Sequence, residues 1–80
     1  MTEERVRKIV ARVAKVDEAK AMAFGAEADL FRELGVVSTA ALDLLLSLEE
    51  EFGVSIGDQE FGEARTIRAL AQLLDRLAAA

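Results

Sequence analysis

An uninterrupted stretch from Thr39 to Phe52 contains neither glycine nor proline and directs the chain toward a helical fold. After Thr39, its only polar residues before the closing glutamates are Asp43 and Ser47. A stretch of this kind predicts one helix about 21 Å long, because each helical residue adds about 1.5 Å. Gly53 follows at the position where a glycine commonly ends a helix.

This helix has two different faces. An apolar stripe recurs at helical spacing, with Leu44 at its edge, and consists of Ala41, Leu42, Leu45, Leu48 and Phe52. The other face is acidic and consists of Thr39, Asp43, Leu46, Ser47 and Glu50. We expect the stripe to pack on a core and the acidic face to meet solvent.

Three consecutive glutamates, residues 49–51, occupy the last turn of this helix. Carboxylates there are mildly unfavourable, because the helix C-terminus carries partial negative charge. Helix stability therefore does not explain them. Two interpretations remain open: a solvated surface that keeps a small protein soluble, or a docking surface for basic partners.

The chain has 80 residues, of which 52% are hydrophobic, with no proline and four phenylalanines as its only aromatic residues. This length and composition predict a single domain, residues 1–80, built as a small helical bundle. A first amphipathic helix has Thr2 as a candidate cap and ends near Lys15 or Val16, and its apolar positions are Val6, Ile9, Val10 and Val13. Residues 17–33 predict a loop with partial helical turns.

Within that loop, Asp29 is placed to cap a short turn whose apolar residues, Leu30, Phe31 and Leu34, would reach the core. After Gly53, Val54 and Ile56 are expected to tuck inward. Asp58 is predicted to cap a brief helix around Gln59–Glu63, with Phe61 facing inward. Thr66 is predicted to cap the last helix, whose apolar positions are Ile67, Leu70, Ala71, Leu74 and Leu77.

Charge is unevenly distributed along the chain. Residues 1–16 carry a net charge of +3, residues 17–63 carry −10 and residues 64–80 carry +2. An acidic middle argues against nucleic acid, whose phosphates require a clustered basic surface. It favours partners with basic patches.

Several chemical classes lack the residues they need. The chain has no cysteine and no histidine, and no base adjoins Ser38 in the sequence, so we expect neither an enzyme nor a structural metal site. The apolar runs are shorter than the roughly 20 residues of a membrane span. We expect a soluble, cytoplasmic protein.

Four segments occur in a characteristic order: TEERVRKIV, LFRELGVVS, a leucine-rich helix ending LEEEFGVSI, and a last helix opening at TI. Over nearly the whole chain this arrangement resembles the acyl carrier protein family. The resemblance implies an all-α four-helix bundle, with three main helices and a short third one. It also implies that a phosphopantetheinyl transferase uses coenzyme A and Mg²⁺ to attach a 4′-phosphopantetheine arm to Ser38, whose thiol then holds an acyl group as a thioester.

Three residues differ from the family pattern. Val37 stands where the family usually has aspartate, Thr39 where it has leucine or methionine, and Gly57 where it often has proline. A second interpretation is therefore a carrier-like helical module that is not modified and acts only in protein binding or regulation. Without the resemblance, Ser38 would be read as a helix N-cap, a role that can coexist with modification.

The resemblance also implies two further groups of residues. The positions expected to touch partner enzymes, which transfer, ligate or condense acyl groups, are Asp43, Leu46, Glu49 and Glu50. A cavity for the acyl chain would lie between the long helix and the short third one, lined by Leu44, Leu48, Ile56 and Phe61. Fatty acid, polyketide and related pathways all use this fold, so the carried group stays open. We expect a monomer.

Overall fold

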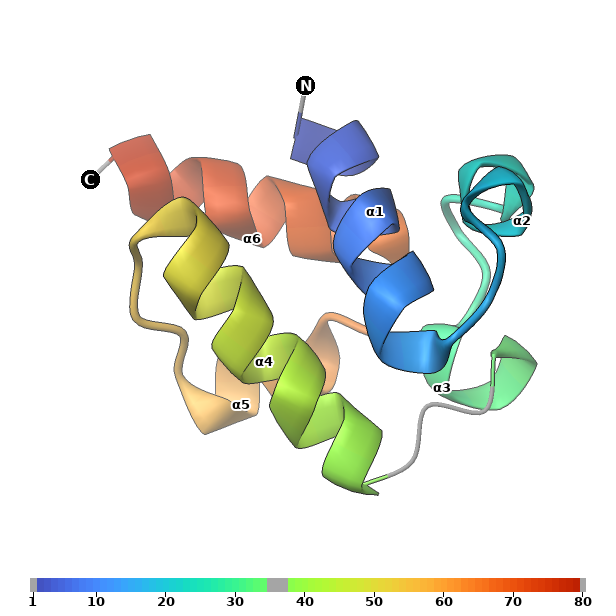
Figure 1. Ribbon diagram of the computed structural model, residues 1–80. Helices are drawn as coiled ribbons and strands as arrows, with labels where there is room; N and C mark the ends of the chain where they lie inside the picture. The colour runs from blue at the N-terminus through green and yellow to red at the C-terminus, as the bar shows by residue number, and fades with distance from the viewer. Residues whose placement is uncertain (1, 35–37, 80) are drawn as a thin grey trace.

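The computed structural model describes residues 2–34 and 38–79, and for Ser38 it describes the backbone only. Its helices are α1 (Thr2–Ala14), α2 (Glu18–Ala23), α3 (Leu30–Glu33), α4 (Ser38–Phe52), α5 (Asp58–Glu63) and α6 (Ile67–Ala79) (Figure 1). These described ranges contain no strand. The predicted all-α bundle of three long helices with a short helix before the last is confirmed.

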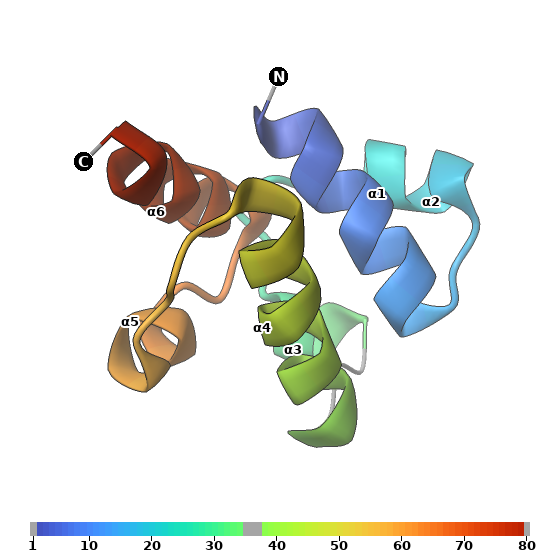
Figure 2. The same cartoon turned by 60° about the vertical axis from the view of Figure 1, so that its left-hand side comes forward.

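The three long helices α1, α4 and α6 surround one apolar interior. Helix α1 packs against α2, α4 and α6. Helix α5 closes the side between α4 and α6, while α2 lies beside α1 away from α5 (Figures 1 and 2). The largest side chains that are fully buried come from all three long helices and α3, and they are Val6, Val10, Leu30, Leu44, Leu48, Ile67, Leu70 and Leu74.

The buried stripe of α4 differs from the predicted one at two leucines. Leu42 is 56% exposed, whereas Leu44 is fully buried, so the assignment of Leu42 to the stripe and of Leu44 to its edge was wrong. The reason is angular: successive residues turn by about 100° around a helix, which places Leu42 about 120° from Leu48 and Leu44 about 40° from it. Leu45 and Leu48 are buried as predicted.

Helices α1 and α4 end in the same way with different residues. Gly53 has φ +64° and the Val54 N–H donates to the Glu49 carbonyl at 3.2 Å, which confirms the predicted glycine terminus. At the end of α1, Lys15 takes the left-handed conformation with φ 59°, and the Val16 N–H donates to the Ala11 carbonyl at 3.1 Å. The predicted end near Lys15 is therefore confirmed.

Residues 17–33 are more regular than predicted. They form the six-residue helix α2 and the four-residue helix α3, so the expectation of a loop with only partial turns understated their structure. The predicted cap is confirmed: the Asp29 carboxylate accepts the Phe31 N–H at 2.9 Å and the Arg32 N–H at 3.2 Å. Leu30 is fully buried.

The predicted N-terminal cap is wrong for α5 and confirmed for α6. Helix α5 begins at Asp58 with Gly57 as its N-cap, so the prediction that Asp58 caps it was wrong by one residue. At the start of α6, the Thr66 hydroxyl accepts the Ala69 N–H at 3.0 Å, as predicted.

No helix in residues 2–34 and 38–79 combines the length and apolarity that a membrane crossing requires.

Candidate functional site

Ser38 is the first residue of α4, at the end of the helix that carries partial positive charge. The predicted cap depends on its side chain, which lies outside the described part of the chain. The sequence also predicts a tight turn at Gly35 ahead of the serine, because glycine tolerates such a turn. Gly35 and Val37 lie outside the described residues. The structure therefore places the backbone of the serine at the N-terminus of the longest helix among the described residues.

An exposed surface continues from this end of the helix. We call it the outer face of α4, and its exposed side chains are Thr39, Leu42, Asp43, Leu46 and Glu50. Leu42 and Leu46 are the only large hydrophobic side chains described as exposed, at 56% and 54%. The Ser47 hydroxyl donates to the Asp43 carboxylate at 3.5 Å. The outer face thus combines two leucines one turn apart with the carboxylates of Asp43 and Glu50 beside them.

The three glutamates at the end of α4 lie in three different environments. Glu49 is half-buried, and its carboxylate accepts the Ile56 N–H at 2.8 Å. Glu50 is exposed. Glu51 pairs with Arg5 at 3.2 Å, and the same guanidinium donates to the Glu51 carbonyl and stacks over the Phe52 ring. A run of identical residues in the sequence gave no sign of this division.

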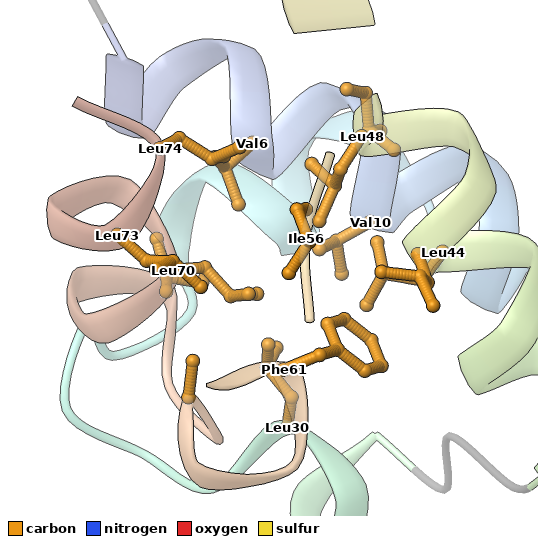
Figure 3. Close-up of a cluster of buried hydrophobic side chains, with 14 residues drawn as sticks. Val6, Val10, Leu30, Leu44, Leu48, Ile56, Phe61, Leu70, Leu73 and Leu74 are labelled. Atoms are coloured by element: carbon orange, nitrogen blue, oxygen red, sulfur yellow. The ribbon is translucent and has the colours of Figure 1, made fainter. Parts of the chain in front are cut away.

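The four residues predicted to line an acyl cavity lie together. Leu44, Leu48, Ile56 and Phe61 are all buried and belong to one hydrophobic cluster. Figure 3 shows Ile56 and the Phe61 ring pointing toward the leucines of α4, with Val10 beside them. Side chains from α4, the segment after Gly53 and α5 therefore meet in the interior, where an apolar chain would have to displace or part them.

Two surface hollows lie elsewhere on the molecule. One has a volume of about 320 Å³ between α5 and α6, over Ala64, Ala69 and Leu73. The other has a volume of about 440 Å³ between α1 and α6, beside Arg68 and Asp75. Neither hollow is lined by the four predicted cavity residues.

Helix α3, which precedes α4 in the chain, is held against the start of α6. The Arg65 guanidinium donates to the Asp29 carboxylate at 2.8 Å and lies 4.7 Å from the centre of the Phe31 ring. The Leu30 N–H donates to the Arg65 carbonyl at 2.8 Å. The hydrogen bond from Arg65 is the main cause that lowers the pKa of the Asp29 carboxyl, with the Arg32 and Phe31 N–H groups adding to it.

Across residues 2–34 and 38–79, no three histidine, cysteine, aspartate or glutamate side chains are grouped so that they could hold a metal ion. The candidate site is the serine end of α4 together with the outer face that leads away from it.

Two comparisons with known proteins show which family this chain resembles. Residues 4–74 match the family described as "Phosphopantetheine attachment site". The chain is 34% identical over 77 residues to the acyl carrier protein of Thermosynechococcus vestitus, an alignment that covers 96% of this chain and 91% of the relative.

Proposed function

The chain belongs to the phosphopantetheine-attachment family of carrier proteins, and from this premise we propose that Ser38 is the attachment residue. The observation that carries the proposal is the position of Ser38 as the first residue of a 15-residue helix. A helix N-terminus favours a negatively charged group, so a phosphodiester suits this end of α4. The match to the family over residues 4–74 includes both Ser38 and the helix behind it.

In this proposal, a transferase joins the phosphorus of the phosphopantetheine part of coenzyme A to the Ser38 oxygen. The serine loses its proton and adenosine 3′,5′-bisphosphate leaves. The bound 4′-phosphopantetheine group supplies a thiol that holds an acyl group as a thioester. The chain itself catalyses no step; it presents the cargo to partner enzymes at a high effective concentration.

We further propose that the outer face of α4 binds these partners. Asp43, Leu46 and Glu50 are exposed on it, and the exposed Leu42 extends its apolar part. Glu49, at the edge of this face, is included as a contact that a basic partner can reach. The expected partners are the phosphopantetheinyl transferase and acyl-transferring, ligating or condensing enzymes with basic patches, in fatty acid, polyketide or related biosynthesis.

The cluster of Leu44, Leu48, Ile56 and Phe61 is proposed as the lining that receives the apolar part of the cargo. All four are apolar and buried, and they meet between α4 and α5 (Figure 3). Such a lining would shield a thioester-bound chain from water by the same apolar burial that stabilises the core.

The first test of attachment is an intact mass measurement. The protein is incubated with coenzyme A, Mg²⁺ and a broad-specificity phosphopantetheinyl transferase, beside a Ser38→Ala control. We expect the wild type alone to gain one phosphopantetheine mass. If nothing is added, and Val37→Asp restores addition, the chain is instead an unmodified carrier-like module for binding or regulation.

The docking surface has its own test. Asp43→Lys combined with Glu50→Lys should lower kcat/KM for loading by about tenfold or more at low salt, because complementary charge accelerates association. The matched control is Glu4→Lys combined with Glu18→Lys, which changes the net charge equally at exposed positions on α1 and α2. Equal loading rates for the two double variants would reject the outer face as the docking surface.

A further inference from the structure

Glu49 differs from the glutamate beside it, because its carboxylate is turned toward the segment that follows the helix. Glu49 Oε2 accepts the Ile56 N–H at 2.8 Å, across seven residues of sequence. Glu50 is exposed, and within residues 2–34 and 38–79 its carboxylate makes no hydrogen bond or ion pair. The two adjacent carboxylates therefore have different contacts: Glu49 binds a backbone N–H, and Glu50 faces solvent.

Few contacts hold residues 53–57, the segment that contains this Ile56 N–H. Gly53 turns the chain with φ +64°, and the Gly57 N–H donates to the Glu60 carboxylate at 3.4 Å. Between them, Ile56 is 6% exposed and packs in the apolar cluster. The bond from Glu49 therefore fixes the backbone of the one residue of this segment that is buried.

Ile56 lies where several elements of the core meet. Its side chain lies between the leucines of α4 and the α5 and α6 side of the core (Figure 3). Glu49, for its part, lies about 100° around the helix from the buried Leu48 and about 100° from Glu50 on the outer face, so it stands at the border of both. One side chain thus adjoins the docking face and the buried cluster.

We propose that Glu49 is a latch that couples docking on the outer face of α4 to the position of Ile56, an inference that rests on the proposed carrier function. The carboxylate accepts the Ile56 N–H while it is turned toward residues 53–57. A cation docked on the outer face attracts the same carboxylate outward and so competes with the Ile56 N–H. By linkage, a ligand that displaces Ile56 from the cluster strengthens docking by the factor by which docking strengthens the binding of that ligand.

The latch is tested first on the unmodified protein, by the hydrogen exchange rate of the Ile56 amide in NMR spectra. Glu49→Ala removes the acceptor and should raise that rate by about tenfold. Glu49→Gln keeps an acceptor oxygen without the charge and should stay within about threefold of the wild type. Glu50→Ala, the matched control on the same turn, should leave the rate unchanged.

Two results would overturn the latch. One is an unchanged Ile56 rate in Glu49→Ala. The other is an equal rise at Ile56 and at the amide of the fully buried Leu70, because that would mean general destabilisation rather than local release.

The coupling is tested with a hexalysine peptide at low salt, with binding followed by the amide shift of Leu46. At saturation, the peptide should raise the Ile56 exchange rate several-fold in the wild type and in Glu4→Ala, a control at an exposed position of α1, and should add nothing in Glu49→Ala. If the Ile56 exchange rate of the wild type is unchanged at saturating peptide, docking is not coupled to Ile56. Neither measurement needs loading, so failure at Ser38 and failure of the latch are separate results.

Discussion

Two connections of different length follow helices α1 and α4. The long connection is residues 15–34, after α1, and the short connection is residues 53–57, after α4. They begin in the same way, but different contacts hold them against the rest of the protein. Each opens with a residue in the left-handed conformation. The long connection is then held mainly by arginine side chains that reach it from α1, from α6 and from Arg65 just before α6. The short one is fastened by a buried isoleucine and by carboxylates that accept its N–H groups.

Three arginines fasten the long connection. Arg7 of α1 donates to the carbonyls of Ala21, Met22 and Phe24 at the end of α2. Arg68 pairs with Glu27 at 2.8 Å, and Arg65 pairs with Asp29 at the same distance. Because the Arg65 and Arg68 pairs are largely exposed, solvent screens them, whereas the Arg7 side chain is mostly buried.

Because different contacts hold the two connections, they should respond to different perturbations. The short connection depends on apolar burial at one residue, so it should be sensitive to volume. The long connection also buries Leu30, but polar contacts to its backbone and carboxylates hold the rest of it, so it should in addition be sensitive to the removal of a guanidinium or to acid. Five substitutions, in four tests, break or sharpen this contrast.

The largest effect is expected at the apolar anchor of the short connection. Ile56→Ala should lower the free energy of unfolding by about 2–4 kcal/mol, because it removes buried methyl and methylene groups and leaves a cavity. Urea unfolding measures it. The control is Val54→Ala at a half-buried position of the same connection, which should cost less. Equal losses would show that burial does not single out Ile56.

The next effect is at the main fastening of the long connection. Arg7→Met keeps most of the apolar stem but removes the donor that three carbonyls share, and should cost about 2 kcal/mol. Of the three, the Ala21 carbonyl keeps a bond from the Phe24 N–H at 3.4 Å. Arg12→Met is the matched control, because Arg12 is exposed on the same helix. Amide exchange should accelerate in α2 more than in α4. Uniform acceleration would argue against a local fastening.

A smaller effect is expected where the two connections begin. Lys15→Gly should raise the free energy of unfolding by about 0.5–1 kcal/mol, since glycine adopts the left-handed conformation without steric cost but loses more chain entropy on folding. Gly53→Ala should lower it by about 1 kcal/mol for the same steric reason. Thermal unfolding of both variants measures the pair, and changes of the same sign would contradict the argument.

The smallest effect is expected at the exposed ion pair of the long connection. Asp29→Asn keeps a capping oxygen but loses the charge that Arg65 holds. Because the pKa of Asp29 is lowered in the folded protein, its stabilising contribution is present at neutral pH and is lost as pH falls through that lowered pKa. The wild type should therefore be the more stable at pH 7, and the difference should shrink below about pH 4. Urea midpoints across this range check it, and a difference independent of pH would contradict it.

Much of the fold was predictable because it depends on local pattern. The spacing of Val6, Ile9 and Val10 predicted the buried face of α1, and Gly53 and Thr66 predicted helix ends that the structure confirms. Two errors were local: the placement of Leu42 and Leu44 around α4, and the cap of α5 at Asp58 instead of Gly57. The structure of residues 17–33 was underestimated because distant contacts decide it. Helix α2 has a weak apolar pattern of its own and is completed by Arg7, which precedes it by more than ten residues.

For the candidate site, the sequence by itself determined the position of Ser38 at the head of a long helix and the acidic, leucine-bearing outer face, because both follow from the order of residues along one helix. Only the tertiary structure decided what each glutamate at the end of that helix does. Glu49 bonds Ile56, Glu51 pairs with Arg5, and Glu50 stays in solvent. The reason is that three identical neighbours point about 100° apart, so their roles depend on which other segments pack on each side.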